Sequence, residues 1–232
     1  MIALFYGTRP QVIKASVLRD ALAAAGETVA AIDTGQHYDY ALHQVHYEQL
    51  GVRPPDAALD VGSGTHAGQT AAILAAAERW IAARRPLPRL AVVIGDTNST
   101  LACALAAAKL RVPVAHVEAG LRAADRHMAE EINRRAVDSI AELLFAPCER
   151  VGAMLRRQYP DARIAVPGDV ARDVLCRALR RLPAPPARVA GPYVYATLHR
   201  AELVDDAGRL AAVVAALVAG PLPGVLAAHP RT

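Results

Sequence analysis

Short apolar segments alternate with longer segments of helical periodicity along most of the chain. Residues 2–7, IALFYG, form the first apolar segment, and Pro10 and Gly26 mark the start and stop of the helical segment after it. The same pair of patterns recurs in residues 28–33 and 41–51, 90–96 and 99–110, 112–120 and 130–142, and 143–147 and 149–159. This order is typical of buried strands covered by helices. The alternation therefore predicts an α/β fold with a doubly wound parallel sheet.

The apolar side chains are mostly small and aliphatic. Hydrophobic residues make up 53% of the 232 residues, whereas aromatic residues make up only 4%. Alanine, valine and leucine therefore dominate the predicted core, and such side chains allow helices to pack closely on a sheet. A chain of this length is long enough for one well-packed domain and part of another.

A proline-rich segment, RLPAPPARVAGP at residues 181–192, interrupts the alternation. We expect a first Rossmann-like domain over residues 1–170, a hinge and linker over residues 171–192, and a second Rossmann-like domain over residues 193–232. The last part contains only two apolar strands and a helix, which cannot cover their own apolar faces. We therefore expect the second domain to be incomplete in this sequence.

Charge and cysteine content narrow the choice of partners. The chain has 26 basic and 22 acidic residues, a net charge of +4, and its arginines are scattered. This pattern does not favour nucleic acid and suits a small anionic ligand. Cys103, Cys148 and Cys176 have neither disulfide nor zinc-site spacing, which indicates a reducing cytoplasm and no metal site. No run of about 18 apolar residues is present that could span a membrane.

Polar, glycine-containing loops follow four of the predicted strands. They cover Gly7 to Pro10, Gly35 to Asp39, Gly95 to Thr97 and His116 to Arg122. In a parallel sheet these loops meet at the carboxyl edge of the strands, where α/β proteins bind their ligands. One such loop is usually no more than a capped helix start. Four in succession favour a binding site.

Arg9 and Lys14 flank the first turn of the first predicted helix. The amino end of a helix attracts anions, so two cations beside it suit a phosphate group. Lys14 could equally be an ordinary solvated side chain. The chain lacks both the GxGxxG and the P-loop patterns, so neither bound NAD nor ATP hydrolysis is supported.

Carboxylates and one histidine occur where loops and helix starts follow the strands: Asp96, Glu118, Glu130, Glu131 and His199. Acid–base chemistry needs such groups facing each other across a cleft. Simpler explanations remain open for each of them. Asp96 could cap the helix that begins near Ser99, and Glu130 or Glu131 could pair with Arg134 one turn later.

Nine different short motifs are distributed from one end of the chain to the other. They are GTRPQVIKA, DTGQHYDY, VGSGTH, IGDTNSTLA, HVEAGLR, AEEINR, PGDVARD, ATLHRAE and HPRT. In their order and spacing they closely resemble the non-hydrolysing UDP-N-acetylglucosamine 2-epimerase family. The resemblance covers essentially the whole chain. Its most specific part is HVEAGLR followed by EEINR.

The resemblance implies two Rossmann-like domains in the glycosyltransferase-B arrangement, with a nucleotide sugar between them and no dissociable coenzyme. The implied reaction interconverts UDP-N-acetylglucosamine and UDP-N-acetylmannosamine by eliminating UDP and adding it back. Asp96, Glu118 and Glu130 match the acid–base carboxylates, and His199, also in the catalytic set, matches a diphosphate contact. The family further implies a cytoplasmic homodimer, formed through the first domain, that serves cell-surface polysaccharide biosynthesis.

Further residues match the substrate site of the family: Arg9, Lys14, Gln36, His37, Arg122, Glu131 and Arg134. The chain departs from the family pattern in two places. Ala129 stands where the family usually has proline before the acidic pair, and the sequence stops at Thr232, before the family's Ser-Gly-Gly and Glu-Glu-Ala segments. We therefore expect these 232 residues by themselves to be catalytically inactive.

Three alternatives remain open at this point. A glycosyltransferase of the same architecture would share the diphosphate site but would need an acceptor site as well. A non-catalytic fragment would bind nucleotide weakly at most. The substrate could also be a diacetamido relative of UDP-N-acetylglucosamine, because enzymes with such motifs use both.

Overall fold

The computed structural model describes residues 1–36, 51–181, 189–198 and 201–228. The chain divides into two compact units, Met1–Arg181 and Leu182–Thr232, and each is described by itself. The helix predicted over residues 41–51 falls almost wholly outside the described residues.

Seven strands form one sheet in the first unit, in the order β3-β2-β1-β4-β5-β6-β7. They are β1 (Ile2–Tyr6), β2 (Val29–Asp33), β3 (Ala57–Ala58), β4 (Leu90–Ile94), β5 (Val114–Val117), β6 (Leu143–Phe145) and β7 (Arg163–Ala165). Every neighbouring pair is parallel, which confirms the predicted doubly wound sheet. The strand order reverses between β1 and β4, the position where ligands bind in sheets of this kind.

The helices of the first unit are α1 (Arg9–Ala24), α3 (His66–Ala82), α4 (Asn98–Lys109), α5 (Ala129–Ile140), α6 (Glu149–Gln158) and α7 (Val170–Arg181). Helix α3 and the short strands β3 and β7 were absent from the predicted alternation. Helix α3 connects β3 to β4, and Ile73, Ala77 and Ile81 lie fully buried along it at a spacing of one helical turn.

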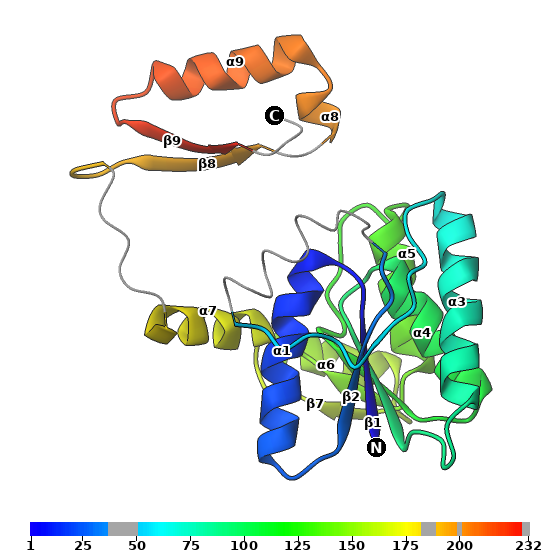
Figure 1. Ribbon diagram of the computed structural model, residues 1–232. Helices are drawn as coiled ribbons and strands as arrows, with labels where there is room; N and C mark the ends of the chain where they lie inside the picture. Colours follow the sequence, from blue (N-terminus) through cyan, green and yellow to red (C-terminus); the bar gives the residue numbers. More distant parts are fainter. Residues whose placement is uncertain (37–50, 182–188, 199–200, 229–232) are drawn as a thin grey trace. The chain divides into compact units, whose positions relative to one another are not determined.

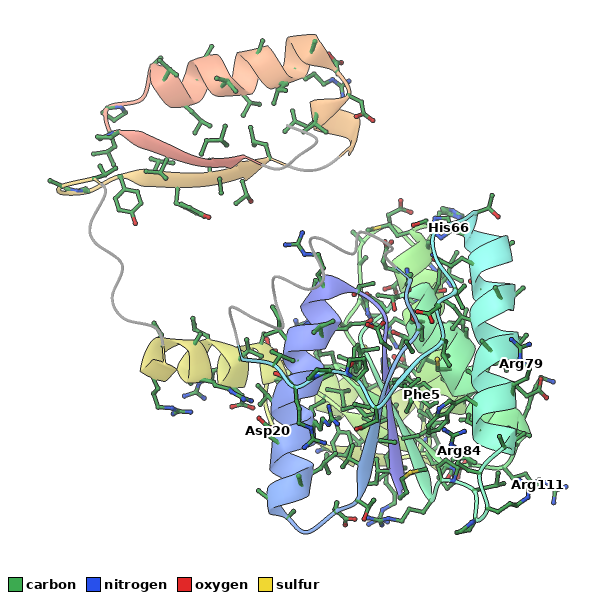
Figure 2. All side chains as sticks on the ribbon, viewed as in Figure 1. Phe5, Asp20, His66, Arg79, Arg84 and Arg111 are labelled. Carbon is green, nitrogen blue, oxygen red and sulfur yellow. The ribbon has the colours of Figure 1, made fainter. Side chains whose placement is uncertain are left out.

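The two faces of the sheet bury separate aliphatic cores. Ala3 and Phe5 of β1 belong to the core shared with α3, α4 and α5, whereas Leu4 and Tyr6 belong to the core beside α1. Figure 1 shows these two groups of helices on opposite sides of the sheet. Phe5 lies in the interior of the unit in Figure 2 and meets Trp80 of α3 edge to face at 5.8 Å between ring centroids. Both faces are thus covered, as parallel sheets require.

The first unit extends further than the predicted boundary at residue 170. Helix α7 packs against α1, because Val170 joins the same core as Val12 and Arg177 forms an ion pair with Asp20 at 2.6 Å. The first unit therefore ends at Arg181, and the predicted hinge over residues 171–181 is a helix of that unit.

The second unit contains the predicted strand, helix and strand. Its elements are β8 (Val194–Leu198), α8 (Ala201–Val204), α9 (Ala207–Val218) and β9 (Gly224–Ala228). Strands β8 and β9 are parallel, and Asp206 caps α9 by accepting hydrogen bonds from the backbone of Gly208 and Arg209. Tyr195 of β8 is 62% exposed and Val218 of α9 is 80% exposed. The unit thus leaves large apolar side chains uncovered.

None of the helices in the described residues is both long enough and apolar enough to cross a membrane.

Candidate functional site

The four polar loops predicted from the sequence all leave the carboxyl ends of strands in the first unit. Gly7 follows β1, Thr34 follows β2, Gly95 follows β4 and Glu118 follows β5. These strands are neighbours in the order β2-β1-β4-β5, so the loops lie along one edge of the sheet. Helix α3 also begins there, at His66, whereas Arg84 and Arg111 lie at the opposite end of the unit in Figure 2.

Gln11 joins the loop after β1 to the loop after β4. Its side-chain oxygen accepts hydrogen bonds from the backbone of Gly7 at 2.9 Å and Thr8 at 3.2 Å. Its amide nitrogen donates to the Ile94 carbonyl at 2.6 Å and to the Thr97 hydroxyl at 3.0 Å. Because both ends of a buried amide are paired, the two loops are held at a fixed spacing.

Gln36 and Thr34 tie the loop after β2 to the start of α4. The Gln36 side-chain oxygen accepts hydrogen bonds from the Ser99 hydroxyl at 2.6 Å and the Ser99 backbone N–H at 3.0 Å. The Thr34 hydroxyl lies 2.7 Å from the same serine hydroxyl. Gln36 was predicted to bind substrate, and in this structure its side chain is buried and holds the scaffold of the edge.

Glu118, the first residue after β5, has a left-handed conformation with a φ of 65°. Residues other than glycine rarely adopt this conformation, and it is often retained at functional sites. The Glu118 carboxylate accepts a hydrogen bond from the Lys14 ammonium at 2.6 Å, and the two side chains are 13% and 22% exposed. Lys14, predicted to bind phosphate, is therefore also the cation that faces this carboxylate.

Asp96 accepts a charged hydrogen bond from Arg134 of α5, and its side chain remains 31% exposed. The Asp96 carbonyl accepts a further hydrogen bond from the Asn133 side chain at 3.0 Å. The explanation of Asp96 as a helix cap is wrong, because Thr97 caps α4 by accepting from the Thr100 backbone. The Asp96 carboxylate is thus held at the edge by Arg134 of α5, and it does not cap α4.

Glu131 lies fully buried beneath the first turn of α5. It accepts hydrogen bonds from Arg134 at 2.8 Å, Arg135 at 2.7 Å and the Ala123 backbone at 3.0 Å. Burial by itself raises the pKa of the Glu131 carboxyl, but the Ala123 hydrogen bond and the two arginines outweigh it and lower that pKa. The pairing of Glu131 with Arg134 is therefore confirmed, and a direct substrate contact by either residue stays a prediction.

Glu130, by contrast, is exposed in the first turn of α5, and its carboxylate has no hydrogen-bond or ion-pair partner in the part of the chain that the structure describes. Arg9 is half-buried as the first residue of α1. The other two predicted site residues, His37 and His199, lie outside the described residues. Their roles remain predictions.

A buried cluster behind the edge was not predicted from the sequence. His116 of β5 lies between the Asp138 carboxylate, at 2.8 Å from its Nδ1, and the Gly95 carbonyl, at 2.7 Å from its Nε2. Arg122, predicted to bind substrate, donates to the other Asp138 oxygen at 2.7 Å. The motif HVEAGLR contains both His116 and Arg122, but their common partner Asp138 lies later in the chain, in helix α5.

Gly95 separates the two candidate carboxylates of neighbouring strands. It precedes Asp96, and a Cβ atom at Gly95 would lie 3.4 Å from the Glu118 carboxylate oxygen Oε2. Asp96 and Glu118 thus follow neighbouring strands beside one glycine turn, and each forms an ion pair with its own cation, Arg134 of α5 or Lys14 of α1. Such an arrangement of anionic oxygens and mobile cations suits proton transfer next to a departing anion.

A groove of about 460 Å³ lies between the starts of α3, α4 and α5. Beside it Ile132 is 53% exposed and Met128 is 41% exposed. Its lining residues are His66, Ala67, Thr70, Ala71, Leu74, Asn98, Ala129, Ile132 and Asn133. The groove is therefore mainly apolar and open to solvent.

The fold and the edge residues can be compared with known proteins. A family model described as UDP-N-acetylglucosamine 2-epimerase matches residues 20–232. The chain belongs to this epimerase family. The relative from Pseudomonas aeruginosa, named UDP-2,3-diacetamido-2,3-dideoxy-D-glucuronate 2-epimerase, is 41% identical over 240 residues that cover 100% of this chain. The UDP-N-acetylglucosamine 2-epimerase of Methanocaldococcus jannaschii is 38% identical and matches 92% of this chain.

The fold of this epimerase-family chain also matches solved structures. A crystal structure of the Methanocaldococcus jannaschii UDP-GlcNAc 2-epimerase in complex with UDP-GlcNAc and UDP superposes with a TM-score of 0.87 at 37% identity. That match covers 100% of this chain and 66% of the other. Among the curated relatives, the chain spans 67% of the Pseudomonas protein and 60% of the Methanocaldococcus protein.

Proposed function

We propose that this chain is part of a non-hydrolysing enzyme that interconverts UDP-N-acetylglucosamine and UDP-N-acetylmannosamine. The observation that supports the proposal most directly is that Asp96 and Glu118 follow two adjacent parallel strands, with the Glu118 carboxylate close to Gly95, the residue before Asp96. We propose that these two carboxylates serve one sugar ring, because epimerisation needs a base for one face and an acid for the other. The related crystal structure that holds UDP-GlcNAc and UDP supports the same substrate class.

In the proposed reaction, the C2 hydrogen of the sugar leaves as a proton to a carboxylate while the anomeric C1–O bond breaks. The electrons of the C2–H bond form the C1–C2 double bond, and those of the C1–O bond leave with UDP. Reversal with proton delivery to the opposite face gives the epimer. Because no carbonyl acidifies the C2 hydrogen, the departure of UDP must be stabilised by cations. Asp96, Glu118 and Glu130 are the proposed proton carriers.

The diphosphate is proposed to bind at the amino end of α1. Arg9 begins this helix and Lys14 lies five residues later, so both cations lie within its first two turns. Lys14 at present faces Glu118 at 2.6 Å, and a bound phosphate would compete for the same ammonium. We infer that Lys14 couples the leaving group to the Glu118 carboxylate. Gln36, His37, His199, Arg122, Glu131 and Arg134 complete the proposed site.

The test is incubation of the full-length protein with UDP-N-acetylglucosamine alone, followed by proton and phosphorus NMR of the products. We expect UDP-N-acetylmannosamine with its diphosphate intact. A hydrolysing enzyme would release free N-acetylmannosamine and UDP, which would contradict the non-hydrolysing assignment. Formation of neither product would contradict the epimerase proposal itself.

A second substrate is favoured by one specific observation, the 41% identity with the Pseudomonas aeruginosa relative named for a diacetamido glucuronate. That substrate carries the same UDP leaving group and the same acetamido group at C2. Parallel assays with UDP-N-acetylglucosamine and with UDP-2,3-diacetamido-2,3-dideoxy-D-glucuronate separate the two. A kcat/KM about tenfold or more in favour of the diacetamido compound would reassign the substrate and leave the reaction class intact.

We also propose that the protein forms a homodimer through its first unit. Exposed Met128 and Ile132 beside the groove of about 460 Å³ support a contact there, because exposed apolar patches commonly mark interfaces. Sedimentation of Ile132→Glu is the test, with Leu87→Glu as a matched control at another exposed apolar residue. We expect only the first to yield monomer. Dimers in both variants would contradict this site, and a monomeric wild type would contradict the dimer.

A further inference from the structure

We propose that His116 is a positioning residue that holds the Gly95 carbonyl and thereby sets the spacing of Asp96 and Glu118. The inference rests on the proposed epimerase function. His116 itself is 0% exposed and contacts solvent nowhere. It therefore acts on the reaction only through the groups that it contacts.

The direction of the hydrogen bonds follows from the chemistry of the partners. The Gly95 carbonyl lies 2.7 Å from His116 Nε2 and can only accept, so Nε2 must carry a proton. On the other side of the ring, His116 Nδ1 lies 2.8 Å from the Asp138 carboxylate. Neighbouring strands support this placement, because His116 of β5 pairs with Val93 of β4, close to the end of that strand.

Asp138 fixes the orientation of the ring. Its carboxylate accepts from the Gly120 backbone at 3.2 Å on each oxygen and from Arg122 at 2.7 Å. These two donors, the Gly120 N–H and the Arg122 guanidinium, hold the Asp138 carboxylate in place beside His116 Nδ1. The ring is thus held at both nitrogens and cannot rotate without losing two hydrogen bonds in a fully buried site.

Gly95 is the residue through which this restraint reaches the edge. Its backbone N–H donates to the Val117 carbonyl at 2.9 Å, and its own carbonyl accepts from His116. With a φ of 70° it turns the chain directly from β4 into Asp96. The backbone N–H and carbonyl of Gly95 are therefore both fixed to β5, the strand that directly precedes Glu118. His116 thus links the backbone next to Asp96 to β5, the strand that precedes Glu118.

His116 is expected to affect catalysis through the position of the Asp96 turn and not through its own charge. Reacting groups must be held close to their working geometry, and a misplacement of about 1 Å can cost about 10²-fold in rate. Removing the donor to Gly95 frees the turn that carries Asp96, whereas removing only the Asp138 contact leaves that turn in place. The two nitrogens of His116 can be tested separately for this reason.

The experiment uses His116→Gln and His116→Asn in the full-length protein. Glutamine can place its amide nitrogen near the position of Nε2 and keep the bond to Gly95, whereas asparagine can reach only the Asp138 side. We expect His116→Asn to lower kcat by about 10²-fold with little change in KM, and His116→Gln to remain within about tenfold of wild type. Equal losses in the two variants would overturn the proposal.

A readout independent of turnover is the backbone amide resonance of Asp96, whose peptide group contains the Gly95 carbonyl. It should shift in His116→Asn and stay near its wild-type position in His116→Gln. A resonance that does not respond to His116→Asn overturns the proposal. A wild type without turnover contradicts the epimerase function instead, and the Asp96 resonance still decides whether His116 holds the turn.

The hydrogen bond from His116 to Gly95 can also be tested in the wild-type protein, even if neither variant folds. Nitrogen-15 NMR of the His116 ring should show a proton on Nε2 that exchanges slowly with solvent, because the ring is fully buried. An unprotonated Nε2 would overturn the proposal, since the Gly95 carbonyl offers no proton of its own.

Discussion

The Lys14 ammonium lies 2.6 Å from the Glu118 carboxylate, and this ion pair joins the first helix to the first residue of the turn after β5. Both side chains are mostly buried, and each keeps part of its surface exposed. A cation proposed for the leaving group and a carboxylate proposed for proton transfer are therefore direct neighbours. Movement of either one changes the environment of the other.

Glu118→Gln removes the proton-transfer function and keeps the shape of the side chain. Lys14 can still donate to the glutamine oxygen, so folding and substrate binding should be retained. We expect kcat to fall by about 10²–10⁴-fold, the usual effect of losing a positioned acid or base. Steady-state kinetics and calorimetric binding of UDP-N-acetylglucosamine on the full-length protein measure the two effects. Glu149→Gln is the control, because that carboxylate is 76% exposed on α6. Near-normal turnover of the Glu118 variant would remove this residue from the mechanism.

Gly7→Ala should destabilise the first unit, because the added methyl group would overlap the hydroxyls of Thr34 and Ser99. Overpacking of this kind commonly costs about 1–3 kcal/mol. Gly64→Ala is the matched control, since its methyl group would find its nearest neighbour at 3.9 Å. Denaturant unfolding of both variants measures the difference. If the two variants unfold alike, the loops after β1 and β2 are not packed as described.

Stability should depend on pH through Glu131. The folded-state pKa of this carboxyl lies below its ordinary value of 4.5, so ionisation stabilises the folded state above that pH. Glu131→Gln should therefore be less stable than wild type at neutral pH, by about 3 kcal/mol for a broken buried ion pair. The gap should narrow as the pH falls below the ordinary value and through the lowered folded pKa.

Urea titrations of Glu131→Gln at several pH values test this dependence, with the exposed Glu78→Gln as control. The control should differ little from wild type at every pH. A constant gap between the Glu131 variant and wild type across the acid range would mean that its charge contributes nothing to stability.

The cysteines should differ sharply in reactivity. Burial raises the pKa of the Cys103 thiol, so it stays protonated at neutral pH, and the side chain is 0% exposed. Cys148 is exposed at the start of α6. Because the thiolate is the reactive species, iodoacetamide should label Cys148 in the native protein and Cys103 only after unfolding. Mass spectrometry of the labelled peptides gives the result, and rapid native labelling of Cys103 would contradict the described core.

Much of the first unit follows from local pattern. Buried strands such as β1 and β4 are unbroken apolar runs between turn residues, so their positions and parallel order could be predicted. Helix α3 was missed because the strand before it, β3, has only two residues and gives no apolar run. The end of the unit was placed too early because α7 lies next to the proline-rich segment, and its packing on α1 is a long-range contact.

For the site, the sequence predicted which loops meet but not which side chains pair. Glu118 and Lys14 lie far apart in the chain, and so do Asp96 and Arg134, so only the folded sheet brings them together. The sequence does contain a weak indication of the role of Asp138, because its spacing places it on the same face of α5 as Glu131 and Arg134. Polar residues on a buried helix face need partners, and that rule could have directed attention to this cluster.

The proposed reaction removes and replaces the hydrogen at C2 of a UDP-linked acetamido sugar. The most direct measurement is proton NMR of UDP-N-acetylglucosamine incubated with the full-length protein in D₂O. We expect deuterium from solvent at C2 of UDP-N-acetylmannosamine and, as the reaction returns, at C2 of the starting sugar. Glu118→Gln should slow the exchange and the epimerisation together. Epimer that forms with its original C2 hydrogen, or substrate that remains unchanged, would contradict the account.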